Sequence, residues 1–172
     1  MQVRIYPDPC LRKTCQPVDT FDDSLRRLAE RMITLMREHK GVGLAAPQVG
    51  VNLRLFVCNP TPEPENDRVY INPVLTDLVG VVEAEEGCLS IPEVLVSVRR
   101  AQRCRLAALD LTGQPVEVAA DDLEARVWQH ETDHLDGVLI LDKMSQADKI
   151  ATRRMLKQLE EDHRKNTRSR TR

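Results

Sequence analysis

The sequence predicts an α+β fold in which mixed or antiparallel β-sheets surround a central helix, with a further helix at the C-terminus. Short segments typical of strands occupy the middle of the chain, and a helical pattern containing His130 and His134 follows them. Because strands and helices do not alternate along the chain, a doubly wound parallel sheet is not expected. The 172 residues are enough for one domain with a sizeable core and short for two.

The composition gives no reason to expect nucleic-acid or membrane binding. Hydrophobic residues make up 41% and charged residues 30%, as in ordinary soluble globular proteins, and the formal net charge is −2. The chain has no run of about 18 apolar residues, and its start lacks the basic and apolar regions of a secretory signal. We therefore expect a cytoplasmic protein without DNA or membrane partners. The five cysteines are scattered and odd in number, so a disulfide framework is not expected.

The N-terminal part of the chain is expected to form a strand and then an amphipathic helix. The opening MQVRIYPDPC reads as the first strand of the fold. In the stretch that follows, apolar residues recur at helical spacing; Asp22 or Asp23 can cap the start of the helix, and Gly41 can end it. The apolar stripe consists of Leu25, Leu28, Met32, Leu35 and Met36.

The middle of the chain reads as strands separated by turns. VNLRLFVCN and RVYINPVL are joined by the proline- and acid-rich PTPEPEND, which we expect to be an exposed loop. VLVSVRR, CRLAALDL and PVEVAA read as further strands, whereas EAEEGCLSIP is too short and too interrupted by glycine to be a simple strand. A second helix is expected from Asp121 or Asp122 to about Gly137, and the tail from Ser145 starts as a helix and becomes strongly polar.

The second helix carries the most informative motif. In WQHETDHLDG, the residues His130, Glu131 and His134 form the pattern His-Glu-x-x-His. Residues four apart share a helix face, so the two imidazoles can converge on one metal ion while Glu131 serves as general base. A bare match to this pattern also fits a charged, solvent-exposed helix face.

A catalytic site of this kind needs a third protein ligand and one open position. Downstream, LDGVLILDKMSQADKI contains no histidine, and the spacings of Asp136 and Asp142 are unconvincing. Upstream, Cys88 lies in EGCLS, and its thiolate would complete a Cys-His-His set. The alternative for any single cysteine is a small buried hydrophobic residue.

Three stretches of the chain resemble the motifs of the peptide deformylase family, in that family's order. GVGLAAPQVG (41–50) resembles the first motif, EGCLS (86–90) the second and QHETDHLDG (129–137) the third. PDPCLRKTCQPV and YINP also look like family sequence, so the resemblance extends to about residue 145. We therefore expect residues 1–145 to be the catalytic domain and 146–172 to be a peripheral helix and basic tail of the same domain.

The resemblance implies both an activity and a metal. The expected reaction is hydrolysis of the formyl group from nascent chains that begin with N-formylmethionine, which releases formate. Cys88, His130 and His134 would bind one divalent metal, with Fe(II) the expected native ion and Zn, Ni or Co also suited to these ligands.

The resemblance also implies the groups that act on the substrate. Glu131 would be the general acid and base. The side-chain amide of Gln48 and the backbone N–H of Leu89 would stabilise the oxyanion of the tetrahedral intermediate.

Contacts with the rest of the substrate are assigned to residues near these motifs. Gly43 leaves room for a peptide backbone, to which its own backbone can bond in strand-like fashion. Glu86 is expected at the substrate site, either orienting a metal ligand or as a polar loop group. Trp128 either packs in the core or lines the pocket, and Arg126 either caps the pocket or faces solvent. The walls of the pocket for the methionine side chain are expected from Val42, Leu123 and Val127.

Two other functions stay open at this point. A His-Glu-x-x-His metallopeptidase would share the chemistry, but the usual downstream ligand is missing. A structural zinc site would need four protein ligands, and the sequence offers three good ones. The basic end, DHRKNTRSRTR, is either a ribosome contact that attracts RNA phosphate, as in some relatives, or a solvated, frayed tail.

Overall fold

The computed structural model describes residues 1–61 and 63–170. The strands are β1 (Gly43–Ala45), β2 (Leu55–Cys58), β3 (Arg68–Val79), β4 (Val82–Cys88), β5 (Ile91–Arg100), β6 (Arg103–Leu109) and β7 (Pro115–Asp121). The α-helices are α1 (Asp23–Glu38), α2 (Asp122–Leu135) and α3 (Gln146–Arg170), and short 3-10 helices are η1 (Pro9–Arg12), η2 (Ala46–Val49), η3 (Pro64–Asn66) and η4 (Ile140–Lys143).

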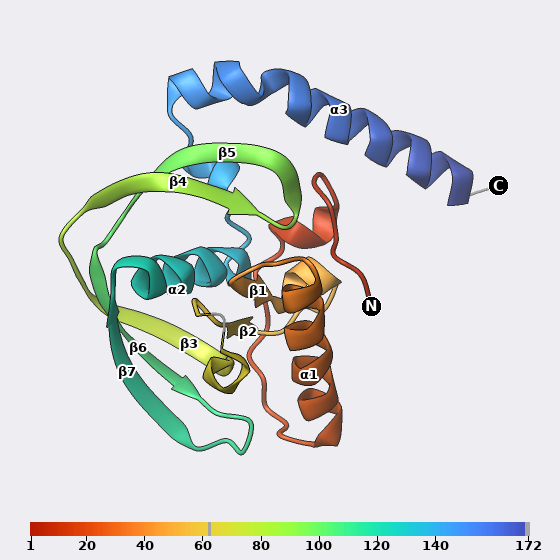
Figure 1. The fold of residues 1–172 in the computed structure, drawn as a ribbon. Helices are drawn as coiled ribbons and strands as arrows, with labels where there is room; N and C mark the ends of the chain where they lie inside the picture. The colour runs from red at the N-terminus through yellow and green to blue at the C-terminus, as the bar shows by residue number, and fades with distance from the viewer. Residues whose placement is uncertain (62, 171–172) are drawn as a thin grey trace.

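Helix α2 lies between two antiparallel sheets (Figure 1). On one side is a five-stranded sheet with the order β1-β2-β3-β6-β7, and on the other is the hairpin formed by β4 and β5. This arrangement confirms the predicted α+β fold with a central helix and a C-terminal helix. Strand β1 forms one edge of the large sheet, so the side of β1 that faces away from β2 has no strand partner among the described residues.

Helix α1 begins and ends close to the positions expected from its sequence. The Asp22 side chain accepts hydrogen bonds from the backbone N–H groups of Ser24 and Leu25, at 2.9 and 3.0 Å, which caps the helix. At the other end Lys40 takes the left-handed conformation, with φ 55°, and Gly41 N–H bonds to Met36 O at 2.9 Å. The helix thus stops three residues before Gly41, because Lys40 makes the turn.

Two hydrophobic cores hold the two helices α1 and α2 against the large sheet. One lies between α2 and the large sheet and contains Trp128, which is 1% exposed and packs edge-on against Tyr70 with ring centroids 5.7 Å apart. Trp128 is therefore a core residue and does not line the pocket. The other packs the apolar stripe of α1, including Met32 and Met36, against β1, β2 and Ile71.

The prediction of a strand at the N-terminus is wrong, because residues 1–8 contain no strand. Pro7 and Pro9 have no N–H to donate, so this stretch cannot sustain a ladder of hydrogen bonds. It instead makes two isolated backbone bonds, from Arg4 N to Gln48 O at 2.7 Å and from Tyr6 N to Ser90 O at 2.8 Å. The segment thereby links two parts of the chain that lie next to Cys88.

The stretch around Cys88 is also more regular than its sequence indicated. Residues Val82–Cys88 form β4, and Cys88 pairs with Ile91 at the tight end of the hairpin. A register shift between Glu86 and Cys88 accommodates Gly87 within the strand. Gly87, which argued against a simple strand in the sequence, thus lies at an irregularity in the pairing of β4 with β5.

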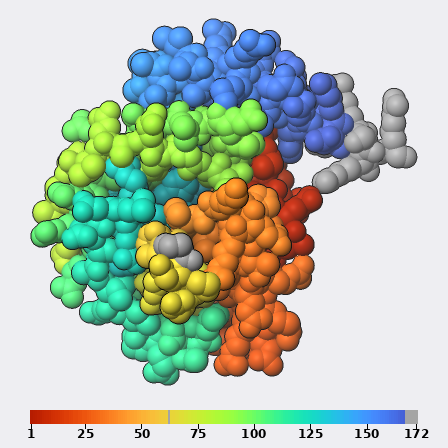
Figure 2. All heavy atoms as spheres, in the orientation of Figure 1, coloured from red at the N-terminus to blue at the C-terminus, as the bar shows by residue number. Residues whose placement is uncertain are grey.

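Helix α3 packs on the outer side of the hairpin (Figure 2). Its half-buried Met155, Leu156 and Leu159 contact a third core cluster formed by the hairpin, η1 and η4. Near the far end of this contact, Tyr6 Oη donates a hydrogen bond to Glu160 Oε1 at 3.0 Å. Over the described residues, no helix combines the length and apolar character required to cross a bilayer.

Candidate metal centre

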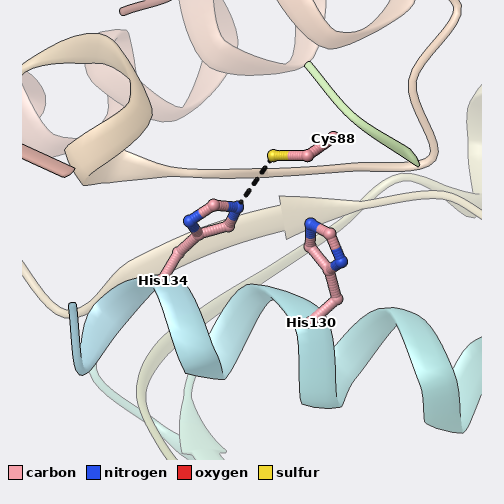
Figure 3. Close-up of side chains that lie close together, drawn as sticks. All are labelled: Cys88, His130 and His134. Atoms are coloured by element: carbon pink, nitrogen blue, oxygen red, sulfur yellow. Dashed lines mark hydrogen bonds between the residues drawn. The ribbon is translucent and has the colours of Figure 1, made fainter. Parts of the chain in front are cut away.

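Helix α2 presents His130 and His134 on the face that looks toward the end of the hairpin (Figure 3). The helix runs from Asp122 to Leu135, as predicted, and the two imidazoles are one turn apart, with ring centroids separated by 5.0 Å and ring planes at 70°. His134 is buried and His130 is mostly buried, so the positions of both rings are set by packing against the rest of the fold. Two convergent imidazoles are half of a metal site.

Cys88 completes the group from the end of β4. Its Sγ lies 3.3 Å from His134 Nε2, and one ligand atom each from Cys88, His130 and His134 lie within 4.8 Å of one another. Among the described residues this is the one group of histidine, cysteine or acidic side chains so arranged. Segments 42 or more residues apart in sequence are brought together because the hairpin folds over α2.

The chemistry of these donors fits a divalent metal. His130 Nδ1 lies 3.0 Å from Glu86 Oε2, which leaves Nε2 of that ring for a metal and fixes its orientation. Burial alone would lower the pKa of His130, but hydrogen bonds to Cys88 and Glu86 outweigh it and raise the pKa to about 10. The negative groups that hold a proton there would equally attract a cation. A thiolate with two imidazoles suits Zn, Fe, Co and Ni.

The carboxylate of Glu86 is fully used by protein groups. It accepts hydrogen bonds from Arg100 at 2.6 and 2.8 Å and from Arg126 at 2.6 Å, besides its contact with His130. Burial would raise the pKa of Glu86, but the bonds from His130 and Arg100 hold it well below the usual range for a carboxyl group. Glu86 is therefore ionised and positions His130. It borders the cavity, but its carboxylate has little capacity left for a substrate.

Arg126 does not face solvent. It is buried, and its guanidinium also donates to the carbonyls of Val98 and Val82, at 3.0 and 2.9 Å. These bonds attach the hairpin to α2 and give the buried guanidinium its acceptors.

Glu131 follows His130 on α2, and its side chain is buried at the wall of the site. Burial raises its pKa to about 7, against the opposing effect of the positive charges of His130 and Arg100. Its Oε2 is buried without a hydrogen-bond partner among the described residues. A carboxyl group whose pKa is close to neutral is suited to taking up a proton and giving it back.

The position of Glu131 also explains why residue 43 is glycine. A Cβ at Gly43 would lie 2.3 Å from Glu131 Oε1, so any side chain there would displace the carboxylate. Sequence reasoning assigned this glycine to the approach of a substrate backbone. The structure adds a second and more immediate reason.

Gln48 is held by its neighbours with its amide group directed at the metal centre. It is 1% exposed, and its Oε1 accepts a hydrogen bond from Ala45 N at 2.8 Å. Its Nε2 donates to Ser90 Oγ at 3.1 Å and lies 3.5 Å from Cys88 Sγ. The amide orientation follows from the bond to Ala45, because a backbone N–H can only donate and so must face the amide oxygen, which leaves the NH₂ group toward Ser90 and Cys88.

A cavity of about 820 Å³ opens beside the group of donors and is lined by Cys88 and His130. Its volume is in the range of ligand-binding pockets. Leu89, in the turn between β4 and β5, and the edge strand β1 lie on its wall. Of the residues predicted to contact substrate, the wall includes Val42, Gly43, Glu86, Leu123 and Val127.

Two residues of the network around the donors were not singled out from the sequence. Arg100 and Asp133 form an ion pair, with Arg100 Nη1 2.7 Å from Asp133 Oδ2. Asp133 lies inside the third motif, so its position there was a signal. Nothing local to VLVSVRR indicated that Arg100 would be buried beside a metal centre.

A thiol and two imidazoles at the wall of a cavity, with a buried carboxylate beside them, are the arrangement expected of a metal-dependent hydrolase. The family model of polypeptide deformylase matches residues 1–150, and the chain belongs to this family. It is accordingly an enzyme that removes N-terminal formyl groups from polypeptides in a metal-dependent reaction.

Individual relatives agree with this assignment. A peptide deformylase of Thermotoga maritima is 43% identical over 156 residues, which cover 90% of this chain and 93% of the relative. A crystal structure of peptide deformylase from Plasmodium falciparum has a TM-score of 0.91 at 36% identity, covering 95% of this chain and 97% of the other. The plant enzyme PDF1B of Arabidopsis thaliana, solved with an inhibitor, has a TM-score of 0.93 at 38% identity, covering 97% and 94%.

Proposed function

We propose that Cys88, His130 and His134 hold one divalent metal and that Glu131 moves the proton when the formyl group of an N-formylmethionyl chain is hydrolysed. The observation that supports this most directly is the convergence of three donor atoms within 4.8 Å beside a buried carboxylate whose pKa is about 7. When bound, the metal lowers the pKa of water from 15.7 to about 7 and polarises the formyl carbonyl. Fe(II) is the proposed native ion, and Zn, Ni and Co suit the same ligands.

The role of Glu131 follows from its burial. It takes a proton from the water whose oxygen adds to the formyl carbon, and it passes a proton to the nitrogen as the C–N bond breaks. The products are formate and a free amino terminus. Proton transfer by a positioned side chain is typically worth about 10² to 10⁴ in rate.

The oxyanion of the tetrahedral intermediate needs fixed donors. We assign these to Gln48 Nε2 and the backbone N–H of Leu89. The bonds of Gln48 to Ala45 and Ser90 support its part, because they hold the amide in place before the substrate binds. Losing one such donor typically costs on the order of 10² to 10³ in rate.

The substrate is proposed to lie along the edge strand β1. Gly43 belongs to that strand, and its unpaired side can bond an extended peptide as an additional strand would. The methionine side chain would contact the apolar part of the cavity wall, formed by Val42, Leu123 and Val127.

A second proposed contact is with the ribosome, through the helix and tail of residues 146–172, which we regard as peripheral to the catalytic domain. The described part of α3 carries cationic side chains beyond the segment that packs on the hairpin, including Arg164 and Lys165. Attraction of these groups to RNA phosphate would be weakened by salt. The side chains of Arg168 and Arg170, and all of Arg172, lie outside the described residues. We propose the cytoplasm as the place of action, where nascent chains are made.

The test is release of formate from a short formyl-Met peptide by protein loaded without air with Fe(II) or Ni(II). We expect activity in the wild type and a loss on the order of 10² to 10⁴ in Glu131→Gln, which keeps the size of the side chain and removes the base. An active Glu131→Gln protein with bound metal would remove Glu131 from the proposal. Internal cleavage of an unformylated peptide, with no formate released, would favour a metallopeptidase instead.

A further inference from the structure

Arg100 is the most buried charge beside the metal centre that the proposed chemistry does not use. It ends strand β5, and its side chain is 2% exposed. Its Nε and Nη2 donate to the two oxygens of Glu86, at 2.6 and 2.8 Å, and its Nη1 donates to Asp133 Oδ2 at 2.7 Å. One guanidinium thus joins two carboxylates.

These carboxylates belong to the two elements that carry the metal donors. Glu86 lies on β4, two residues before Cys88, and its Oε2 contacts His130 Nδ1 at 3.0 Å. Asp133 lies on α2 and directly precedes His134. Any movement of the hairpin relative to α2 would change the distance between Cys88 and the histidines and would also stretch the bonds of Arg100.

We propose that Arg100 is a positioning residue that locks the hairpin onto α2 and thereby fixes the spacing of the three metal donors. The inference rests on the proposed metal assignment and extends it. Arginine suits the role because its planar fork can bind one carboxylate with two N–H groups and a second carboxylate with the remaining edge. A lysine ammonium is a point charge on a flexible stem and cannot hold both in a fixed geometry.

Removing this link need not unfold the protein, because each carboxylate has another cation. Glu86 also accepts a bond from Arg126 at 2.6 Å, and Asp133 lies 3.2 Å from Lys143 Nζ. Without Arg100 both carboxylates would stay paired, but the hairpin and α2 would no longer share this cation. Protein without Arg100 is therefore expected to bind metal less tightly and with an altered arrangement of the three donors, in addition to any loss of stability.

Arg126 provides a matched control. It is also buried and bonds the same Glu86 oxygen, but its other acceptors are the carbonyls of Val98 and Val82, and Asp133 is not among them. Arg126→Lys should lower the melting temperature but change the metal spectrum less than Arg100→Lys does, because it leaves the bonds of Arg100 to Glu86 and Asp133 in place. Arg100→Lys should change both.

The experiment uses the full chain loaded with Co(II), whose visible absorption reports the donor set and its geometry. Wild-type, Arg100→Lys and Arg126→Lys proteins are compared in absorption spectrum, melting temperature and rate of cobalt loss to a chelator. We expect Arg100→Lys to lose cobalt about 10- to 100-fold faster, the usual effect of losing a group that orients a ligand. Asp133→Asn, which keeps the shape of the side chain, should act in the same direction, and adding it to Arg100→Lys should cause little further loss.

The outcomes distinguish a failure of the proposed role of Arg100 from a failure of the metal assignment on which it rests. A wild-type spectrum and release rate in Arg100→Lys, or equal effects of Arg100→Lys and Arg126→Lys on metal release, would show that Arg100 serves stability alone. Wild-type protein that binds no cobalt, or a spectrum unaffected by Cys88→Ser, would overturn the metal assignment itself and this inference with it.

Discussion

At the scale of single residues, Gly43 is the position where the structure makes the sharpest demand. An added Cβ would lie 2.3 Å from Glu131 Oε1 and 2.8 Å from its carboxyl carbon. Gly43→Ala should therefore push the carboxylate out of place and reduce kcat on a formyl-Met peptide on the order of 10²-fold. The measurement is steady-state kinetics on protein with verified metal content, so that loss of metal is not mistaken for loss of the base.

A compensating change distinguishes this displacement from general damage. Asp at position 131 is one methylene shorter and leaves space for a Cβ at position 43. In the wild-type background Glu131→Asp should reduce the rate, whereas in the Gly43→Ala background it should cost less or restore activity. Fully additive losses would mean that Gly43 and Glu131 do not act on each other.

Cys88 should be the cysteine that oxidises when the iron-loaded enzyme meets air. Cys15, Cys58 and Cys104 are buried, and burial raises the pKa of the Cys10 thiol to about 12, with a further contribution from Asp8. Such thiols are un-ionised at neutral pH and react slowly. We expect activity of the Fe(II) form to decay in air, the Ni(II) form to persist, and mass spectrometry to place added oxygen on Cys88. Equal stability of the two forms would contradict this.

The residues of the metal centre could be predicted where they belong to short sequence motifs. His130, Glu131 and His134 lie within one turn and a half of helix, and Cys88 completes a recognisable set. Arg100 was not predictable in this way, because its role depends on the pairing of β4 with β5 and on where α2 lies beneath the hairpin. Such a role exists only in three dimensions.

At the scale of elements, the sequence was most informative where apolar periodicity was long. The helices α1 and α2 and the strands β2, β3, β6 and β7 of the large sheet occur where they were expected, whereas the short edge strand β1 was not predicted. The N-terminal stretch was misread because its alternating apolar residues resemble a strand, while its prolines prevent continuous pairing. The strand around Cys88 was missed because a glycine and a register shift conceal the regular pattern.

The contact between η1 and η4 leads to a prediction about stability and pH. Asp142 accepts hydrogen bonds from Arg12 and from Leu139 N, and these outweigh burial and lower the pKa of its carboxyl group. A lowered folded-state pKa adds stability above the unfolded pKa of about 4, and that stability is lost as pH falls through the folded value. Asp142→Asn should thus reduce the free energy of unfolding near neutral pH, and the difference from wild type should shrink below about pH 4. Urea denaturation of both proteins near neutral pH and below about pH 4 tests this. The same difference in the free energy of unfolding at both pH values would refute it.

At the scale of the whole molecule, the site depends on parts of the chain that never touch the metal. The N-terminal segment bonds Gln48 and Ser90 through its backbone, and the same segment is linked to α3 by the bond of Tyr6 to Glu160. Helix α3 also covers the hairpin that carries Cys88 and Glu86. The first part of α3 therefore packs on the elements that carry the candidate site, and we propose its basic end as the part that contacts a partner.

This division of α3 predicts different results from two truncations. Ending the chain after residue 161 keeps Met155, Leu156, Leu159 and the Tyr6–Glu160 bond, so formyl-peptide activity and melting temperature should stay near wild type. Ending it after residue 145 uncovers the hairpin core. Because those three side chains are only partly buried, the expected loss of stability is on the order of 3 kcal/mol.

Ribosome affinity should fall in the 161 truncation, although its peptide activity and melting temperature stay near wild type. The chain ending at 161 should bind ribosomes more weakly than the full chain, and the full chain's affinity should fall as salt is raised. Arg164→Gln with Lys165→Gln is the matched control, because it removes charge while keeping the helix. Unchanged ribosome affinity in both proteins would leave the basic end of α3 as a solvated tail, and lost peptide activity in the 161 truncation would move the boundary of the catalytic structure further along the helix.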